Sequence, residues 1–359
     1  MNFHARDLWE YLKSQTDKKI VLYGMGNGAD KIIAVCESYG IEIADFFASD
    51  GFVRGHSFHG RRVLSYTETK EKYGKENIIV LLSFASSLQG VLALIKSVAA
   101  ECELYAPDVP VSGSELFNFE FYEANKDKID AARALLCDNE SKRIFDNVIS
   151  YKLSGDVKYL FDAENEKDEV YRDILGAPDF RVAVDAGAYN GDTARELASY
   201  SPKLEKIIAL EPDRRNFRKL SEYAASEPRF SLSLYNNAAW NKEETLIFDA
   251  SGNRNAGVNP AAKKTVEVTG VSIDSLVGER IDYIKYDVEG SEREALEGSK
   301  KTIERDRPAL LVSAYHRSAD IFELPLLIHE TAPDYKLYLR RYAYVPAWDL
   351  NLLAVKDKI

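Results

Sequence analysis

The feature that most constrains the fold is a strand–helix–strand pattern in residues 181–213. An apolar strand runs into an acid and a glycine-bearing turn, a helix follows, and the next apolar strand ends in two further acids. Parallel strands connected in this way bring their carboxyl ends to one edge of a sheet, where open α/β proteins bind ligands. The pattern therefore predicts a binding site at that edge. Its polar and turn-forming residues are Asp185, Gly187, Gly191, Thr193, Glu211 and Asp213.

The charge around the turn indicates which ligand this edge suits. The two glycines let the backbone approach a ligand, and the helix start expected near Thr193 offers unpaired N–H groups. Asp185 and Asp192 flank the turn, however, so they repel a pyrophosphate and attract a cation. Glu211 can accept hydrogen bonds from both hydroxyls of a ribose. S-adenosylmethionine meets these requirements together; the alternative is a turn without a ligand, whose acids only cap the helix.

Composition excludes several classes of function. The formal charge of −11 over 359 residues argues against a nucleic-acid binder, because such proteins need a concentrated basic face. The 45% apolar and 11% aromatic fractions predict globular cores. No apolar run approaches the roughly 20 residues that a membrane helix requires, and the N-terminus does not read as a signal peptide. Cys36, Cys102 and Cys137 are widely spaced, so we expect free thiols in a cytoplasmic protein.

The order of the predicted elements divides the chain into three parts. Residues 1–112 predict a small Rossmann-like α/β domain that begins with a short helix over 1–16. Residues 113–177 place apolar and charged residues at helical spacing, which predicts a helical connector packed on its neighbours. In residues 178–359 the alternation of strands and helices returns. The strands expected there are 182–185, 206–211, 230–236, 282–288 and 309–315, and the helices are 192–200, 213–226, 291–304 and 320–331.

The C-terminal end predicts a different strand pairing. The segments YKLYLRRYAYV and LNLLAVKD are separated only by the turn-rich PAWD, so they should pair antiparallel. We therefore expect an α/β fold in which a mostly parallel sheet ends in an antiparallel C-terminal hairpin. The aromatic residues of this hairpin either cover the sheet or bury the surface of a second copy in a homo-oligomer, and ordinary packing is the favoured interpretation.

A second group of polar residues follows the strand expected over 282–288. Asp287 and Glu289 lie two residues apart at the strand exit, where they can face the same side of a cleft. They could take a proton from a nucleophile, or bind a divalent cation such as Mg²⁺ through hard oxygens. His316 follows the next strand and could act as a base or metal ligand, or lie in a solvated loop. Glu292 could instead belong to a helix N-terminal cap.

Five segments between residues 180 and 355 are informative as a set. They are VDAGAYNGDT, ALEPD, NNAAW, the VSIDSL segment that leads into IDYIKYDVEGSEREALEG, and the strand that ends in AYH. Together they resemble the FkbM family of S-adenosylmethionine-dependent methyltransferases, a class I group with a Rossmann-like sheet. The resemblance implies methylation of a hydroxyl group, often on a sugar or a polyketide-like natural product, and it leaves the small-molecule acceptor unidentified.

The resemblance also implies which residues hold the cofactor. Ala188 stands where many other methyltransferases have glycine, and the resembled family tolerates alanine there. Glu211 is implied to hold the ribose, and Asn237 and Ala238 to lie beside the adenine. The residues implied to surround the methionine moiety are Asp185, Gly187, Tyr189, Asn190 and Gly191.

The expected reaction needs assistance on the acceptor side. A hydroxyl is a poor nucleophile at neutral pH, so a base or a metal ion should assist it. Asp287 and His316 are the candidate catalytic residues, with Glu289 supporting them. The same three residues are the candidate ligands of a divalent cation.

The N-terminal domain carries a less specific signal. Gly24, Gly26 and Gly28 lie between a strand and a helix, and the stretch resembles the small Rossmann-like domain that precedes some bacterial sugar O-acyltransferases. Such a domain could bind a nucleotide-sugar, or it could have kept its fold without a ligand. Two other functions stay open. One is a nicotinamide-dependent oxidoreductase, for which the C-terminal half lacks an obvious catalytic set; the other is a non-catalytic nucleotide-sugar-binding or scaffold protein with a decayed methyltransferase domain.

Overall fold

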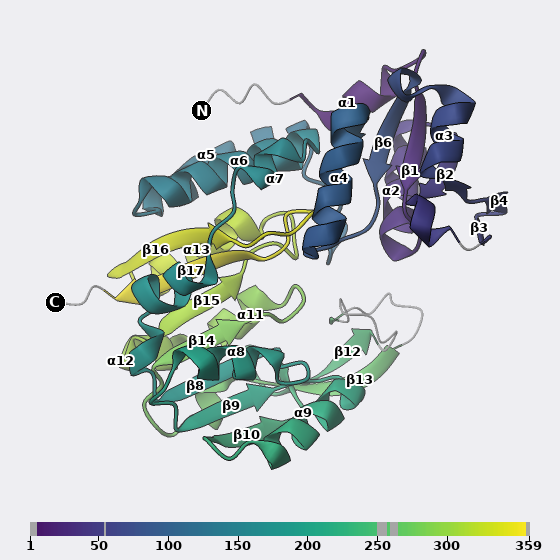
Figure 1. The fold of residues 1–359 in the computed structure, drawn as a ribbon. Helices are drawn as coiled ribbons and strands as arrows, with labels where there is room; N and C mark the ends of the chain where they lie inside the picture. The colour runs from purple at the N-terminus through teal and green to yellow at the C-terminus, as the bar shows by residue number, and fades with distance from the viewer. Residues whose placement is uncertain (1–5, 54, 250–256, 259–264, 357–359) are drawn as a thin grey trace.

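The computed structural model describes residues 6–53, 55–249, 257–258 and 265–356. Figure 1 shows an N-terminal sheet, a larger C-terminal sheet and a group of helices that lies beside both. Among the residues described, no helix combines the length and apolar character needed to cross a membrane.

The N-terminal sheet contains five parallel strands in the order β5-β2-β1-β6-β7. The expected strand, glycine turn and helix are present as β1, the turn and α2 (Figure 1). The strands of this sheet are β1 (Lys19–Tyr23), β2 (Asp45–Ala48), β5 (Leu64–Ser65), β6 (Ile78–Leu82) and β7 (Glu103–Tyr105), whereas β3 (Ser57–Phe58) and β4 (Arg61–Arg62) form a separate antiparallel pair. The helices are α1 (Leu8–Lys13), α2 (Asn27–Tyr39), η1 (Asp50–Phe52), α3 (Tyr66–Tyr73), η2 (Lys75–Asn77) and α4 (Gln89–Glu101).

The sequence did not predict α3 or the short strand β7. The sequence of α3, YTETKEKY, is polar and has no apolar periodicity. A capping box holds its first turn instead: the Ser65 side chain accepts from the Glu68 backbone N–H, and the Glu68 carboxylate accepts from the Ser65 N–H. Strand β7 has three residues, too few for an alternating pattern.

The C-terminal sheet confirms the predicted α/β fold class. Its seven strands follow the order β10-β9-β8-β14-β15-β17-β16. The pairs from β10 to β15 are parallel, whereas β17 pairs antiparallel with both β15 and β16, as expected for the C-terminal hairpin. The strands are β8 (Val182–Ala186), β9 (Lys206–Leu210), β10 (Ser231–Tyr235), β14 (Tyr283–Tyr286), β15 (Ala309–Ser313), β16 (Tyr335–Arg341) and β17 (Leu350–Lys356).

The helix expected over 291–304 is two helices. Gly298 lies at the break, and a side chain there would overlap the carbonyl oxygen of Trp240. This close approach, together with the low helix propensity of glycine, ends the first helix. The helices of this part are α8 (Asp192–Tyr200), α9 (Arg214–Ser226), α10 (Ile273–Leu276), α11 (Glu292–Glu297), α12 (Lys300–Asp306) and α13 (Asp320–Thr331). A small separate sheet contains β11 (Ala238–Ala239), β12 (Glu244–Asp249) and β13 (Thr265–Val271).

The segment between the two sheets is helical, as the sequence predicted. Helix α5 packs on α13 and α6 packs on β16, so the connector covers the C-terminal hairpin (Figure 1). One continuous apolar cluster contains residues of both sheets and of this connector. The elements of the connector are α5 (Phe119–Leu135), α6 (Asn139–Ser154), α7 (Lys158–Phe161), η3 (Glu169–Ile174) and η4 (Ala177–Asp179).

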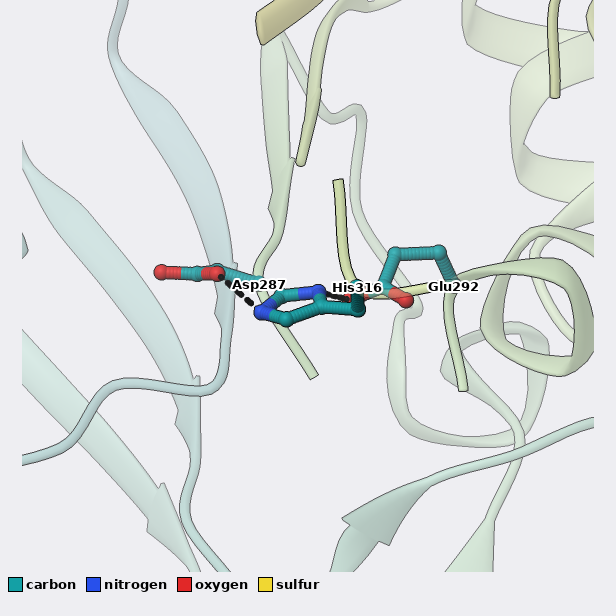
Figure 2. Close-up of side chains that lie close together, drawn as sticks. All are labelled: Asp287, Glu292 and His316. Atoms are coloured by element: carbon teal, nitrogen blue, oxygen red, sulfur yellow. Dashed lines mark hydrogen bonds and ion pairs between the residues drawn. The ribbon is translucent and has the colours of Figure 1, made fainter. Parts of the chain in front are cut away.

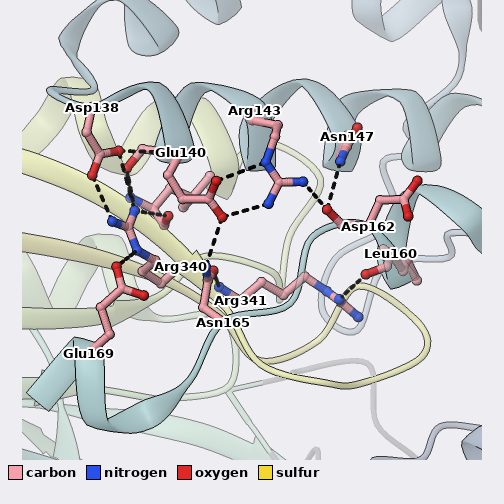
Figure 3. A network of polar contacts seen from close by, with 12 residues as sticks. Asp138, Glu140, Arg143, Asn147, Leu160, Asp162, Asn165, Glu169, Arg340 and Arg341 are labelled. Atoms are coloured by element: carbon pink, nitrogen blue, oxygen red, sulfur yellow. Dashed lines mark hydrogen bonds and ion pairs between the residues drawn. The ribbon is translucent and has the colours of Figure 1, made fainter.

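Two buried arginines at the end of β16 tie the hairpin to the connector (Figure 3). The Arg340 guanidinium donates to Asp138 at 2.7 Å and to Glu169 at 2.9 Å. The Arg341 guanidinium donates to the backbone carbonyls of Leu160 and Tyr344 instead. The hairpin is therefore held by charged hydrogen bonds as well as by apolar packing.

We expect Arg340→Met to lower the free energy of unfolding by at least about 3 kcal/mol, because hydrogen bonds to two carboxylates are lost and each bond to a charged group contributes about 1.5–3 kcal/mol. Methionine keeps the aliphatic volume, so the loss reports the polar contacts. Urea unfolding followed by circular dichroism measures the change. Arg293→Met is the matched control, since Arg293 is 53% exposed in its ion pairs and should contribute less than about 1 kcal/mol. Equal losses in the two variants would contradict the prediction.

Candidate active site

A cavity of about 480 Å³ lies at the carboxyl ends of β8, β9 and β14. This volume is typical of ligand pockets, which measure about 300–1,000 Å³. Part of the wall follows the three strands, and part comes from residues 344–349, the loop between β16 and β17. Ser87, from the N-terminal part of the chain, completes the wall. The sheet edge predicted from the sequence therefore borders a cavity of ligand size.

Glu211, which follows β9, is fixed by two backbone amides. The Tyr189 N–H donates to one carboxylate oxygen and the Asp213 N–H donates to the other, both at 2.8 Å. Burial raises the pKa of Glu211 to about 7, against the lowering effect of these two hydrogen bonds. Each oxygen keeps acceptor capacity beyond its one hydrogen bond. Glu211 can therefore accept two hydroxyl groups at the cavity wall.

The turn after β8 depends on Gly187. Its φ of 88° lies in the left-handed region, and a Cβ there would overlap the carbonyl oxygen of Asp287. Only glycine combines this conformation with so close an approach. Tyr189, two residues later, also has a positive φ of 47°, and its N–H is the one that binds Glu211. The turn thus links the exits of β8, β9 and β14.

A buried lysine connects two acids beneath the cavity. Lys285 Nζ lies 3.6 Å from Asp185 Oδ1 and 3.3 Å from Asp287 Oδ2. Burial lowers the pKa of Lys285, but the charges of Asp287 and Asp185 outweigh it and raise the pKa above its ordinary value. Thr193 Oγ1 donates to Asp185 Oδ2, whereas Asp185 Oδ1 is buried and has no hydrogen-bond partner. Burial raises the pKa of Asp185.

Asp287 combines ionisation with access to the cavity. Ser313 Oγ donates to its Oδ1 at 2.8 Å, on the side away from Lys285. Burial opposes ionisation of this carboxyl, but the charges of Lys285 and His316 outweigh burial and lower its pKa. The side chain of Asp287 is 30% exposed and lines the cavity. Asp287 is therefore an ionised carboxylate that a ligand can reach.

His316 lies behind the cavity wall, where carboxylates surround it (Figure 2). Its Nδ1 is 2.9 Å from Glu292, and its Nε2 is 3.4 Å from Glu289 and 3.7 Å from Asp287. Burial lowers the pKa of His316, but Glu292 and Glu289 outweigh it and raise the pKa to about 10. Burial also raises the pKa of Glu289 to about 8, against the charge of His316. His316 is therefore a buried imidazolium that supports the acids, rather than a group that faces a ligand.

One group of metal-ligating side chains occurs among the described residues. Asp287, Glu292 and His316 each offer a ligand atom within 4.8 Å of the others. The sequence pattern predicted Glu289, and not Glu292, as a metal ligand beside Asp287 and His316. Glu292 already accepts from the N–H groups of Val288 and Gly290 and contacts His316 Nδ1, so its oxygens are satisfied without a cation. The imidazolium likewise neutralises its neighbours. A metal ion at this group stays a hypothesis.

Residues 185–346 match the family model of the methyltransferase FkbM domain. The chain therefore contains an FkbM methyltransferase domain. The resemblance inferred from the sequence motifs is confirmed. No curated protein sequence matches the chain.

One solved structure has the same fold over most of its length. A crystal structure of methyltransferase FkbM from Methylobacillus flagellatus KT aligns with a TM-score of 0.72 at 19% identity, over 94% of this chain and 90% of that chain. An rRNA methylase from Streptococcus thermophilus aligns at 16% identity and a TM-score of 0.35, over 54% of this chain and 95% of that one. Aeropyrum pernix fibrillarin, solved with bound S-adenosyl-L-methionine, aligns at 14% identity and a TM-score of 0.33, over 49% and 66% of the two chains. The first of these similarities establishes the fold across both sheets.

The structure brings together most of the residues predicted for the FkbM site. The predicted residues that line the cavity are Gly187, Tyr189, Thr193, Glu211, Asp213, Ala238, Asp287 and Glu289. The others lie behind the wall or beside it: Asp185, Ala188, Asn190, Gly191, Asn237 and His316. Asn237, for example, donates its side-chain amide to the Thr269 carbonyl at 3.1 Å. Asp213 also caps α9 by accepting from the Arg215 and Asn216 N–H groups, so its place at the wall has a structural role.

Several site residues were not predicted from the sequence. Lys285 was missed, although a lysine inside the apolar strand IDYIKYD is an unusual signal. Glu292 was considered mainly as a cap, and it does bind backbone amides, but it also contacts His316. The loop of residues 344–349 was read as turn and sheet cover; only the cavity reveals that Tyr344, Trp348 and Asp349 line it.

The N-terminal glycine turn has structural contacts of its own. A side chain at Gly28 would overlap the Ser83 carbonyl oxygen, so this turn packs directly against the end of β6. The nearby acids are also engaged: Asp45 binds Lys72 and Tyr73, and Asp50 accepts from Thr67. The interpretation that this part keeps the fold without a ligand accounts for these contacts, and the resemblance to sugar O-acyltransferase domains stays a prediction.

We expect the free energy of unfolding to fall as pH rises from about 6.5 to about 10, because the folded state keeps the His316 proton over that range and the unfolded state releases it. Below about pH 6.5 both states bind the proton, so the contribution of His316 is complete there. Urea unfolding in EDTA at pH values across this range measures the decline.

In the His316→Gln variant the free energy of unfolding should fall less over this pH range. The stability of the variant should therefore approach that of the wild type towards pH 10. His329→Gln is the control, since His329 lies in the last turn of α13 and does not line the cavity. An NMR titration of His316 with a midpoint below about 7 would show that the imidazole is not held charged.

Proposed function

We propose that the protein is an S-adenosylmethionine-dependent methyltransferase that methylates a hydroxyl group of a sugar or natural-product acceptor. The observation that carries the proposal is Glu211, held by two backbone amides at the wall of a ligand-sized cavity inside an FkbM domain. A carboxylate oriented in this way suits the two hydroxyls of a ribose. The turn after β8, whose Tyr189 N–H binds Glu211, borders the same cavity and leaves room there for the methionine tail of the donor.

The charge of the cavity supports a cationic donor. Its wall contains two lysines and a larger set of carboxylates, namely Asp192, Glu196, Glu211, Asp213, Asp287, Glu289 and Asp349. Such a wall attracts a sulfonium and disfavours the pyrophosphate of a nicotinamide dinucleotide. When bound, S-adenosylmethionine supplies a methyl group that is already activated by its sulfonium. Behind the turn, Asp185 Oδ1 is buried without a hydrogen-bond partner, 3.6 Å from Lys285 Nζ, and it adds negative charge near the cavity.

The protein's own task is then to prepare the acceptor oxygen. Asp287 can accept a hydrogen bond from the hydroxyl and so align its lone pair for in-line attack. Because Lys285 and His316 lower its pKa, Asp287 is a weak base that receives the proton late, as the oxygen forms its bond to carbon. Ser313 and Lys285 hold the carboxylate in place throughout. Full removal of the proton beforehand is not required, since the acidity of the hydroxyl rises as the methyl group transfers.

Several observations weigh against the alternative functions. A decayed domain has no reason to keep the contacts of Glu211, Asp287 and Lys285 together at one cavity. An oxidoreductase that used the N-terminal glycine turn would need space where Gly28 packs against β6. The acceptor is proposed to be a small molecule, because the cavity is of that size. The free thiols Cys36, Cys102 and Cys137 fit the proposed cytoplasmic location.

We expect S-adenosylhomocysteine to raise the melting temperature of the wild-type protein and NAD not to do so. Glu211→Ala should weaken S-adenosylhomocysteine binding by at least about 10-fold, because hydrogen bonds to a charged group are lost. Isothermal titration calorimetry measures the dissociation constants. Glu205→Ala is the matched control, since Glu205 is 60% exposed on the neighbouring loop. Stabilisation by NAD alone would overturn the proposed function.

We expect Asp287→Asn to lower methyl transfer by about 100-fold, the usual contribution of a positioned proton acceptor. Donor affinity should change by less than about 3-fold, since Glu211 is untouched. Transfer of labelled methyl groups to an acceptor panel measures turnover, with Asp127→Asn, an exposed residue of α5, as control. Turnover like that of the wild type in Asp287→Asn would remove its proposed role.

The same assay in excess chelator shows whether Asp287 acts as a base or as a metal ligand. Full activity without divalent cations would leave Asp287 as a base and eliminate the metal hypothesis. Activity that returns only on addition of Mg²⁺ would instead assign Asp287 to metal binding.

A further inference from the structure

The loop between β16 and β17 forms a wall of the cavity that no donor-binding motif explains. Tyr344, Trp348 and Asp349 all line the cavity, together with Ser87 from the N-terminal part of the chain. The residues expected to hold the donor follow β8 and β9. Asp287 follows β14, and Tyr315, another lining residue, follows β15, so these two lie towards the hairpin side of the sheet. The loop therefore closes the cavity on the side of the acceptor.

The loop is held in place from three directions. Val345 exchanges two backbone hydrogen bonds with Ser86, at 2.9 and 3.0 Å, which joins the loop to the N-terminal part. The buried Arg341 guanidinium donates to the Tyr344 carbonyl, and it also reaches the connector at Leu160 (Figure 3). At the other end of the loop, the Tyr342 N–H donates to the Asp349 carbonyl at 3.1 Å. This wall is a fixed surface rather than a loose turn.

Asp349 is an acidic residue of this wall; burial raises its pKa, and the charges of Lys167 and Arg341 oppose that rise from beyond ion-pair distance. Among the described residues, none donates a hydrogen bond to its carboxylate or forms an ion pair with it. Its φ of 55° is left-handed, which is costly for a residue other than glycine. Tyr189 and Glu289, two other cavity-lining residues, share this unusual conformation. Backbone strain of this kind persists where the surrounding structure enforces it, commonly at ligand sites.

Three aromatic rings accompany Asp349. The Trp348 ring lies 6.3 Å from Tyr315 and 5.6 Å from Tyr344 between ring centroids, and the first pair is nearly parallel, at 26°. All three residues line the cavity and are partly exposed. Flat aromatic faces beside a carboxylate suit a ligand with an apolar C–H face and hydroxyl groups around its edge. A carbohydrate ring has this distribution of groups.

The charges of the described residues near the loop disfavour a phosphorylated ligand. Of the described residues at the cavity wall, the only lysines are Lys167 and Lys285, and both are already paired. Lys167 binds Glu196, and Lys285 lies between Asp185 and Asp287. No arginine lines the cavity in the described part of the chain. A phosphate at this end would face Asp287, Glu289 and Asp349, and the described residues of the wall offer no free cation to balance it.

We propose that residues 344–349 form the acceptor-binding wall, and that Asp349 accepts a hydrogen bond from a hydroxyl of an uncharged, polyhydroxylated ring stacked beside Trp348. This inference rests on the proposed methyltransferase function and narrows its acceptor to a class without phosphate. It also gives the N-terminal part of the chain a role: Ser86 and Ser87 hold and extend the acceptor wall. On this proposal a nucleotide-sugar is disfavoured as the acceptor.

The first test changes Asp349 while leaving the donor site intact. Asp349→Asn keeps the shape of the side chain, and asparagine tolerates a left-handed φ, so the variant should fold. We expect the dissociation constant of S-adenosylhomocysteine to stay within about 2-fold and the KM for a neutral acceptor to rise at least about 10-fold. Asp127→Asn on α5 is the matched control and should change neither quantity. An unchanged KM in Asp349→Asn would overturn the role of Asp349.

The second test addresses the acceptor class with defined probes. Methyl glycosides of hexoses and 6-deoxyhexoses are offered to the wild-type enzyme beside hexose 1-phosphates and uridine diphosphate hexoses. Methyl transfer to neutral glycosides, and not to the phosphorylated sugars, supports the proposal. Transfer to phosphorylated sugars, or to no neutral glycoside, overturns the assigned class.

A third variant keeps the inference testable if Asp349→Asn is unstable. Trp348→Leu should weaken use of the neutral glycosides without changing S-adenosylhomocysteine affinity, whereas equal use by Trp348→Leu and wild type would contradict the stacked arrangement. Failure of the wild-type protein to bind S-adenosylhomocysteine would instead overturn the proposed function itself. The two failures are therefore distinguishable.

Discussion

The site depends on a row of buried and half-buried charges of alternating sign that crosses the sheet edge. Glu292, His316, Asp287, Lys285 and Asp185 follow one another, with successive contacts of 2.9, 3.7, 3.3 and 3.6 Å. An isolated charge in such a place would be strongly destabilised, whereas each member here is paired with an opposite charge on one or both sides. Asp185 and Lys285 are register partners on the adjacent strands β8 and β14, so the parallel pairing itself sets one of these contacts. Removing one member would therefore unbalance the two neighbours that face it.

This row also explains why the acids at the cavity differ in protonation. Asp287 lies between two cations, and its pKa is lowered despite burial. Among the described residues Glu289 forms an ion pair with His316 alone, and it lies near other acids, so burial prevails and raises its pKa to about 8. Glu211 has amide partners but no cation, and its pKa rises to about 7. One cavity thus offers an ionised carboxylate beside carboxyls that protonate near neutral pH, and a bound sulfonium would favour the ionised form of all of them.

The sequence predicted the parts of this protein that depend on local pattern. The strands and helices around the turn after β8 were expected within about one or two residues, because apolar periodicity and glycine positions specify them. The break at Gly298 was missed because its cause is the Trp240 backbone, which is distant in sequence. Asp287 could be named because it ends a strand, whereas His316 was placed at the cavity although it lies behind it. The place of Asp349 at the cavity could not be predicted, because it depends on the antiparallel pairing of β17 with β15, which brings the loop over the cavity.

The contact between the loop at 344–349 and the N-terminal part of the chain has a chemical consequence for methyl transfer. Water competes with an acceptor hydroxyl for an activated methyl group, so the site must exclude it while the acceptor is aligned. The C-terminal sheet alone leaves its edge open on the side of the hairpin, and the loop at 344–349 covers that side. This loop is fastened to Ser86 of the N-terminal part and, through Arg341, to the connector. The N-terminal sheet therefore contributes to the site through the wall it stabilises, which is a reason for retaining the fold even where its own glycine turn is filled by packing.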